Sequence, residues 1–245
     1  MDKKTFLTGP LPRPGETVMG RSFQEDFGGK GANQAVACAQ LGSPVGLVTK
    51  VGRDAQGRGT LQHLAAVGVD TTFVATAPDL PSGYAAVTID DAGQNMIVVN
   101  LGANASLSRA DVERARPMLQ SAAVVACQLE APLEASLAAF GLAAGDAFRI
   151  LNTAPAPSAG ARSSDLEALL SKADLLCPNE TEAEQLTGEA HPERAAAALL
   201  MTYQAAQAVA VTLGPDGLLL VERGKPAHHI PGIPVKVVDT VGAGD

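Results

Sequence analysis

The sequence predicts an α/β fold in which helices cover both faces of a mostly parallel sheet, a three-layer α/β/α arrangement, with a small β lid. Short apolar runs alternate with amphipathic or alanine-rich segments along the 245 residues, which is the pattern of such a sheet. Two stretches of strand-like sequence interrupt that alternation. Hydrophobic residues make up 46% of the chain and aromatic residues only 3%, so we expect an aliphatic core.

The main sheet and its helices follow from apolar runs and from the glycines that end helices. We predict strands at Gly46–Val51, Ala122–Gln128, Phe148–Asn152, Leu175–Cys177, Ala208–Leu213 and Leu218–Glu222. We predict helices at Ala32–Leu41, Asp54–Val67, Pro132–Ala144 and Glu193–Ala206. Gly42 and Gly68 follow the first two helices directly, where a left-handed residue ends a helix.

The lid is predicted from two segments. Glu16–Phe27 alternates weakly after a proline-rich entry, and the β-branched runs Tyr84–Ile89 and Asn95–Val99 flank Asp90-Asp91-Ala92-Gly93, which favours a hairpin turn. We therefore predict a single domain over residues 1–245, with lid segments inserted at about 10–28 and 82–101.

Net charge and hydropathy argue against two classes of partner, nucleic acids and membranes. A net charge of −8 argues against a nucleic-acid surface, and the sequence has neither a membrane-spanning apolar run nor a secretory leader at its start. The cysteines Cys38, Cys127 and Cys177 are odd in number and far apart, so we expect free, buried thiols in a reducing compartment. These features predict a cytoplasmic protein.

A glycine-rich turn opens the first predicted helix, in the run Gly28-Gly29-Lys30-Gly31-Ala32-Asn33. Three glycines in four positions allow a ligand to approach the backbone closely, and a lysine stands among them. The spacing matches neither the Walker A loop nor the dinucleotide-binding fingerprint. The alternative is a tight strand-to-helix turn without a ligand.

The run Asp239-Thr240-Val241-Gly242-Ala243-Gly244-Asp245 has the chemistry of a phosphate-handling turn. Small residues let backbone N–H groups close on an anion. The carboxylate of Asp245 can take a proton from an attacking hydroxyl.

Three further sites in the sequence each allow two interpretations. Glu130 follows a buried strand, where open α/β sheets bind ligands, or it complements the dipole of the next helix. Asn179 and Glu182 are three residues apart and could order Mg²⁺-bound water or form a helix-capping pair. The stretch Thr212–Gly217 is either a backbone platform for a ligand or a simple hairpin turn.

In this order and spacing, the runs Gly28–Ala35, Asn179…Glu182 and Asp239–Asp245 resemble the ribokinase, or PfkB, family of carbohydrate kinases. The resemblance extends from about Pro10 to Asp245 and implies a ribokinase-like fold. It implies transfer of the ATP γ-phosphoryl group to O5 of D-ribose, giving ribose 5-phosphate.

The resemblance also implies residue roles. Asp245 is the general base, and the anion hole consists of Gly242, Ala243 and Gly244. The sugar is bound by Gly29, Lys30, Gly31, Ala32, Asn33, Glu130 and Asp245. The nucleotide site consists of Asn179, Thr212, Leu213, Gly214, Pro215, Asp216, Gly217 and Gly244. Glu182 holds Mg²⁺ through water, and Asp239 and Val241 bind an activating K⁺. The lid strands pair two subunits into a homodimer, and a nuclear as well as cytoplasmic location is compatible with the family.

The chain departs from the family pattern at both ends. Met1–Thr8 has no apolar run and no Gly-Ser-x-x-x-Asp pattern, so we expect the family's central strand and one sugar-binding acid to be absent. The family continues past the Gly-Asp pair with a helix, so we expect a form truncated at both ends. The alternatives to a ribose kinase are another PfkB sugar or nucleoside kinase, and an inactive truncated form that serves as a binding or pairing module.

Overall fold

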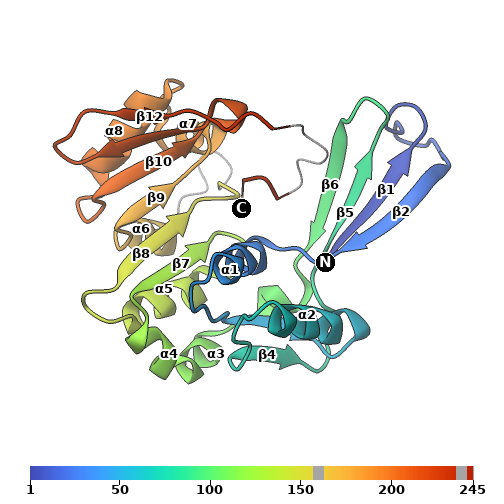
Figure 1. Ribbon diagram of the computed structural model, residues 1–245, viewed down its shortest axis with the longest axis horizontal. Coiled ribbons are helices and arrows are strands. Elements are labelled where there is room, and N and C mark those ends of the chain that lie inside the picture. Colours follow the sequence, from blue (N-terminus) through green and yellow to red (C-terminus); the bar gives the residue numbers. More distant parts are fainter. Residues whose placement is uncertain (157–162, 236–241, 245) are drawn as a thin grey trace. The chain divides into compact units, whose positions relative to one another are not determined.

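The computed structural model describes residues 1–156, 163–235 and 242–244 (Figure 1). The chain divides into two compact units, Met1–Leu107 and Ser108–Asp245. The single-domain description therefore stays a prediction. Among the described residues, no helix combines the length and apolar character needed to cross a bilayer.

The first unit contains a four-stranded sheet in the order β2-β1-β5-β6 (Figure 1). Its strands are β1 (Asp2–Leu7), β2 (Gly20–Asp26), β5 (Tyr84–Ile89) and β6 (Asn95–Asn100). Strand β1 pairs antiparallel with β2 and parallel with β5, and β5 forms the predicted hairpin with β6. Asp90 closes the hairpin turn by accepting hydrogen bonds at Oδ1 from the N–H groups of Ala92 (3.0 Å) and Gln94 (2.8 Å). Both predicted lid segments thus lie in one small sheet.

Strand β1 was not predicted. Its charged residues do not suggest a half-buried strand. Lys4 is nevertheless only 6% exposed, and its ammonium lies 3.1 Å from the Asp26 carboxylate on β2. The opening residues therefore belong to the lid sheet. Within the described residues of the second unit, β7 (Val124–Gln128) pairs with a strand on one side only.

The rest of the first unit consists of β3 (Thr49–Gly52), β4 (Val74–Ala77), α1 (Lys30–Gln40), α2 (Ala55–Ala66) and the short 3₁₀ helix η1 (Gly102–Ser106). Strands β3 and β4 are parallel, and a core of Ala35, Leu64 and Val69 joins the two helices. Helices α1 and α2 confirm the predictions and are followed by glycines in the left-handed region, Gly42 with φ 83° and Gly68 with φ 91°.

The second unit contains a six-stranded sheet in the order β12-β11-β10-β9-β8-β7. Its strands are β7 (Val124–Gln128), β8 (Phe148–Asn152), β9 (Leu175–Cys177), β10 (Ala208–Thr212), β11 (Leu218–Glu222) and β12 (His228–Ile230). Strands β7 to β10 are parallel, and β11 and β12 are antiparallel. The predicted strands of this unit are confirmed, with β8, β9 and β11 at the predicted residues.

Helices pack on this sheet through an aliphatic core. They are α3 (Arg109–Arg114), α4 (Arg116–Ser121), α5 (Leu133–Leu142), α6 (Ser164–Leu170), α7 (Glu180–Thr187) and α8 (Pro192–Thr202). Helix α5 contacts β7, while α7 and α8 contact β10. Leu151, Leu176 and Val209 are paired neighbours on successive strands and are fully buried. Such close aliphatic packing fixes the relative positions of the strand ends.

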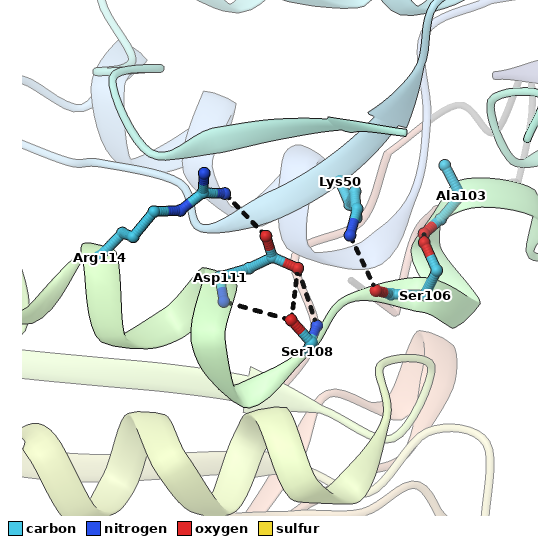
Figure 2. Close-up of polar contacts among 6 residues, drawn as sticks. All are labelled: Lys50, Ala103, Ser106, Ser108, Asp111 and Arg114. Carbon is cyan, nitrogen blue, oxygen red and sulfur yellow. Dashed lines mark hydrogen bonds and ion pairs between the residues drawn. The ribbon is translucent and has the colours of Figure 1, made fainter. Parts of the chain in front are cut away.

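Polar contacts fix two connections (Figure 2). In the first unit, Lys50 Nζ donates to the carbonyl of Ser106 at 3.0 Å and so holds η1 on β3. In the second unit, Ser108 caps α3 in a capping box with Asp111, whose carboxylate also accepts from Arg114 Nη2 at 2.7 Å. The Lys50 contact is at the last residue of η1, whereas the Ser108 capping box orders the start of α3.

Two arginines hold the carboxyl ends of helices. Arg149 on β8 donates to the carbonyls of Phe140 (3.2 Å), Ala144 (3.1 Å) and Ala147 (3.0 Å), at and after the end of α5. Arg223, just after β11, donates to the carbonyl of Leu200 at 2.6 Å, near the end of α8. A cation there donates to carbonyl groups at the end of the helix and complements the helix dipole.

We predict that Arg149→Met lowers the free energy of unfolding by about 2 kcal/mol, because three carbonyls lose a charged donor. Urea unfolding followed by circular dichroism measures the change. The control is Arg109→Met, which removes an arginine that is 65% exposed and paired with Glu113. It should cost less than about 0.5 kcal/mol. Equal losses in the two variants would contradict the structural role of Arg149.

Candidate active site

The glycine-rich turn before α1 has the geometry that the sequence predicts. Gly29 is the residue before the helix and has φ 105°, which a residue with a side chain rarely adopts. Lys30 to Asn33 form the first turn of α1, and Asn33 N donates to the Gly29 carbonyl at 2.9 Å. The backbone is therefore exposed at the amino end of a helix, where it can approach a polar ligand closely.

An acid from the opening strand lies against this turn. A Cβ atom added to Gly28 would overlap the carboxylate of Asp2, so only glycine permits this contact. Strand pairing brings the two together, because Asp2 is opposite Asp26 in the β1–β2 register and Asp26 is two residues before Gly28. Sequence reasoning missed Asp2 because its contact depends on the pairing of β1 with β2.

A cavity of about 200 Å³ adjoins the same turn within the first unit. Its lining includes Gly28 and Asn33 from the turn, Val36 from α1 and His63 from α2. The ring of Phe27 also lines it and stacks on the His63 ring, with centroids 4.4 Å apart and planes 10° apart. Residue Phe27 thereby fixes the start of the glycine turn to α2.

In the second unit, the carboxyl ends of the parallel strands form a common edge. Gln128 pairs with Asn152 and Asn152 with Cys177, so the residues that follow these strands emerge side by side. Glu130 is half-buried in the turn after β7. The alternative of a first-turn acid does not apply, because α5 begins at Leu133 and its first-turn acid is Glu134.

Asn179 and Glu182 form a capping box at the start of α7. Asn179 Oδ1 accepts from Glu182 N at 2.8 Å, and Glu182 Oε2 accepts from Asn179 N at 3.0 Å. Glu182 is only 8% exposed, and its Oε2 lies 3.4 Å from the hydroxyl of the buried Thr153. The capping alternative is thus confirmed, and it fixes a buried carboxylate near the carboxyl ends of the parallel strands.

The carboxylate at this edge of the sheet suits a metal ion that keeps most of its water ligands. The described residues contain no group of three or more His, Cys, Asp or Glu side chains placed to hold a metal ion. Mg²⁺ commonly retains several waters and takes only one or two carboxylates together with substrate phosphates. The single buried carboxylate of Glu182 fits that arrangement.

The stretch Thr212–Gly217 is adjacent to Asn179. Asn179 and Thr212 are bridge partners, and Thr212 N donates to the Pro178 carbonyl at 3.0 Å. The 3₁₀ turn η2 (Gly214–Asp216) connects β10 to β11, so the hairpin-turn alternative is confirmed. Gly217 has φ 99°, and a Cβ there would overlap the Ile230 carbonyl, so the turn requires glycine. Of the predicted nucleotide-binding residues, Asn179 and the stretch Thr212–Gly217 therefore lie together.

The cysteines near the strand ends are not nucleophiles. Burial raises the pKa of the Cys127 thiol to about 12, although a hydrogen bond with Ser136 opposes the shift, and burial raises the pKa of Cys177 to about 11. Both thiols are therefore protonated at neutral pH. All three cysteines are free, as predicted. Cys38 is exposed, so the prediction that it is buried was wrong, and Cys127 and Cys177 are half-buried rather than fully buried as whole residues.

The final motif is described only in part. Gly242, Ala243 and Gly244 form an exposed turn, in which Gly242 has φ 75°. Asp239, Val241 and Asp245 lie outside the described residues.

Comparisons with known proteins agree with this architecture. The family model described as "pfkB family carbohydrate kinase" matches residues 4–245. A ribokinase of Mus musculus is 39% identical over 245 residues, covering 98% of this chain and 74% of the mouse protein. A deoxyribokinase of Salmonella typhi is 37% identical over 242 residues, covering 97% of this chain and 77% of that protein.

Solved structures show the same fold. The structure of Arabidopsis thaliana ribokinase complexed with ribose and ATP superposes with a TM-score of 0.82 at 31% identity, covering 99% of this chain and 78% of that one. With the matched family model and the glycine-rich motifs, this likeness establishes that the chain has a ribokinase-like α/β fold and belongs to the pfkB family of carbohydrate kinases.

Proposed function

We propose that the chain transfers the γ-phosphoryl group of ATP to O5 of D-ribose, giving ribose 5-phosphate and ADP. The observation that carries this proposal is the glycine turn at α1, where Asp2 lies against Gly28 beside Lys30 and Asn33. Carboxylate, ammonium and amide groups at one backbone turn suit the neighbouring hydroxyls of a sugar. The mouse relative named a ribokinase, and the Arabidopsis ribokinase with ribose and ATP, support the choice of substrates.

The sugar site that we propose includes an acid that we expected to be absent. Asp2 takes the role of the family's opening sugar-binding acid, together with Gly29, Lys30 and Asn33. The small residues Gly31 and Ala32 leave room for the sugar above the first turn of α1. Glu130 accepts a hydrogen bond from a further sugar hydroxyl.

The chemical step is an in-line displacement. Asp245 removes the proton from O5 as that oxygen attacks the γ-phosphorus, and the bond from the γ-phosphorus to the bridging oxygen of ADP breaks. The backbone N–H groups of Gly242, Ala243 and Gly244 stabilise the charge on the transferred phosphoryl oxygens. Positioning and charge stabilisation supply most of the catalysis in this kind of reaction.

The nucleotide site that we propose lies at the strand edge of the second unit. Asn179 and the turn Thr212–Gly217 bind ATP, and their direct pairing supports a shared ligand. Glu182 holds Mg²⁺ through water, and that ion neutralises phosphate charge when it is bound. Asp239 and Val241 supply oxygens to K⁺.

A second candidate substrate is 2-deoxyribose, which the 37% identity to a Salmonella deoxyribokinase favours. The purified chain should be tested with ATP, Mg²⁺ and K⁺ against ribose, deoxyribose, fructose and adenosine. Preferred turnover of ribose supports the proposal, and preferred turnover of another substrate identifies another kinase of the family. Binding of a sugar without turnover would favour the inactive binding module.

A homodimer through the lid is the assembly that we propose. Phe23 (61% exposed), Met96 (46%) and Val98 (62%) lie on one face of the lid sheet by strand register. Exposed apolar side chains gathered on one sheet face are typical of an interaction surface.

A cytoplasmic location, with a nuclear one also compatible, stays a prediction.

We predict that Asp245→Asn lowers kcat for ribose by ~10³-fold, because the amide cannot accept the O5 proton. The KM values for ribose and ATP should stay within about threefold, since the substitution preserves shape. A coupled assay of ADP release measures both constants. The control is Asp146→Asn in an exposed turn, which should behave like the parent chain. An unchanged kcat in Asp245→Asn would exclude this residue as the base.

We predict that Asp2→Asn and Gly28→Ala each raise the KM for ribose by about tenfold or more. The first removes a charged acceptor, and the second adds a Cβ that displaces the Asp2 carboxylate. The KM for ATP should not change. The same assay tests both variants, with Gly141→Ala as a control, because a Cβ at Gly141 contacts nothing. Parental ribose KM values in both variants would contradict a sugar-binding role for Asp2.

We predict that Val98→Arg shifts the chain from dimer to monomer, because it places a charge in the apolar face. Sedimentation velocity at micromolar concentration measures the change. Val99→Arg is the matched control, since Val99 is similarly exposed, at 53%, on the opposite face of β6. If Val99→Arg dissociates the dimer and Val98→Arg does not, the interface uses the other face.

A further inference from the structure

Four hydrogen bonds around Asp54 and Ser82 join three segments of the first unit. Asp54 Oδ1 accepts from Gly57 N, which caps α2, and from Ser82 Oγ, both at 2.7 Å. Asp54 Oδ2 accepts from Ser82 N at 2.7 Å, and Ser82 Oγ accepts from Gly52 N at 2.9 Å. The end of β3, the start of α2 and the segment before β5 are thereby fixed to one another. We call this group the Asp54–Ser82 cluster.

Glycines allow the segments of the cluster to meet at backbone distance. A Cβ at Gly52 would overlap the N–H group of Ser82, and a Cβ at Gly57 would overlap the Gly52 carbonyl. Ser82 itself is only 5% exposed. The cluster is therefore a closely packed joint, in which the bond from Gly52 N to Ser82 Oγ is buried and the three bonds to Asp54 are part-buried.

The cluster lies at the base of the lid hairpin. Immediately after Ser82, a Cβ at Gly83 would lie 2.7 Å from the Leu101 carbonyl, and Ala103 N donates to the Pro81 carbonyl at 2.8 Å. The segments before β5 and after β6 thus cross in direct contact. Because Ser82 belongs to this crossing, Asp54 holds the base of the lid hairpin on α2.

The same helix also holds the start of the glycine turn. The Phe27 ring is 3.5 Å from the position of a Cβ on Gly59 and stacks on His63, one helical turn further along α2. Phe27 immediately precedes Gly28. Helix α2 therefore carries the lid base at its amino end and the glycine turn on its side, all within one compact unit.

We propose that Asp54 is a positioning residue for the sugar, which acts through Ser82 and α2 to set the base of the lid hairpin relative to the Gly28–Asn33 turn. This inference rests on the proposed sugar kinase function and assigns Asp54 no contact with the substrate. Small displacements of positioning groups strongly reduce the rate of a reaction. Loosening this joint should therefore raise the KM for the sugar more than the KM for ATP.

The protonation state of Asp54 is consistent with this role. Burial opposes ionisation, but hydrogen bonds from the Ser82 side chain, Ser82 N and Gly57 N outweigh it and lower the pKa of Asp54 below its ordinary value. The carboxylate is therefore ionised at neutral pH and can accept all of these bonds at once. An asparagine would replace one acceptor oxygen with a donor.

The kinetic test compares Asp54→Asn, Ser82→Ala and the double variant, each assayed well below its Tm. We expect the KM for ribose to rise ~10-fold in each single variant and no further in the double variant, because both remove the same joint. The KM for ATP should stay within about twofold. The matched control is Asp70→Asn, which removes an acceptor of Thr72 N at 2.8 Å in the same unit but touches neither the lid base nor α2.

A second measurement does not depend on turnover. Hydrogen–deuterium exchange should accelerate in Asp54→Asn both at residues 83–89 and at residues 27–33, and in Asp70→Asn at neither segment. Acceleration at 83–89 alone, or equal rises in the KM values for ribose and ATP, would overturn the positioning role. If the parent chain phosphorylates no sugar, the proposed function fails, and the exchange result still decides whether Asp54 couples the two segments.

Discussion

The arrangement of the strand ends in the second unit depends on the parallel pairing of β7, β8, β9 and β10. This register aligns Gln128, Asn152 and Cys177 and makes Asn179 a direct partner of Thr212. A shift by one residue would turn the buried side chains of a strand to its other face and separate these ends. The fully buried aliphatic side chains on β8, β9 and β10 prevent such a shift. The core thus determines the position of side chains that lie outside it.

The first unit depends instead on contacts that only glycine allows. Gly28 admits the Asp2 carboxylate, while Gly52 and Gly57 let three segments meet around Ser82. A side chain at Gly52 or Gly57 would have to push backbone atoms apart, at a cost of about 1–3 kcal/mol, and one at Gly28 would displace the Asp2 carboxylate. Glycine also loses more conformational entropy on folding than other residues. Glycines at these positions therefore lower the stability of the fold, and the close contacts explain why they are needed. The sheet that carries Asp2 and the turn that carries Lys30 are joined by such contacts.

Sequence predicted the elements with strong local signals and missed those that depend on pairing. Strands β8, β9 and β11 were predicted at their observed bounds because each contains consecutive apolar residues next to a polar one. The short helices α3, α4 and α6 span six or seven residues, too few to show a helical period. Strand β1 was missed because the burial of Lys4 involves an ion pair with Asp26 on β2, which the local sequence does not show. The position of Asp2 follows from the same pairing.

The two readings of Asn179 and Glu182 could not be separated from the sequence, and the structure explains why they are compatible. The cap uses Glu182 Oε2, which accepts from Asn179 N and lies within reach of the Thr153 hydroxyl. An ionised carboxylate offers about four lone-pair sites, so the cap leaves acceptor capacity for a metal-bound water. The capping bonds also restrain the side chain, and a restrained carboxylate loses less conformational entropy when it binds a ligand. In this arrangement, the local interaction that starts α7 also preorganises the acid that we assign to Mg²⁺.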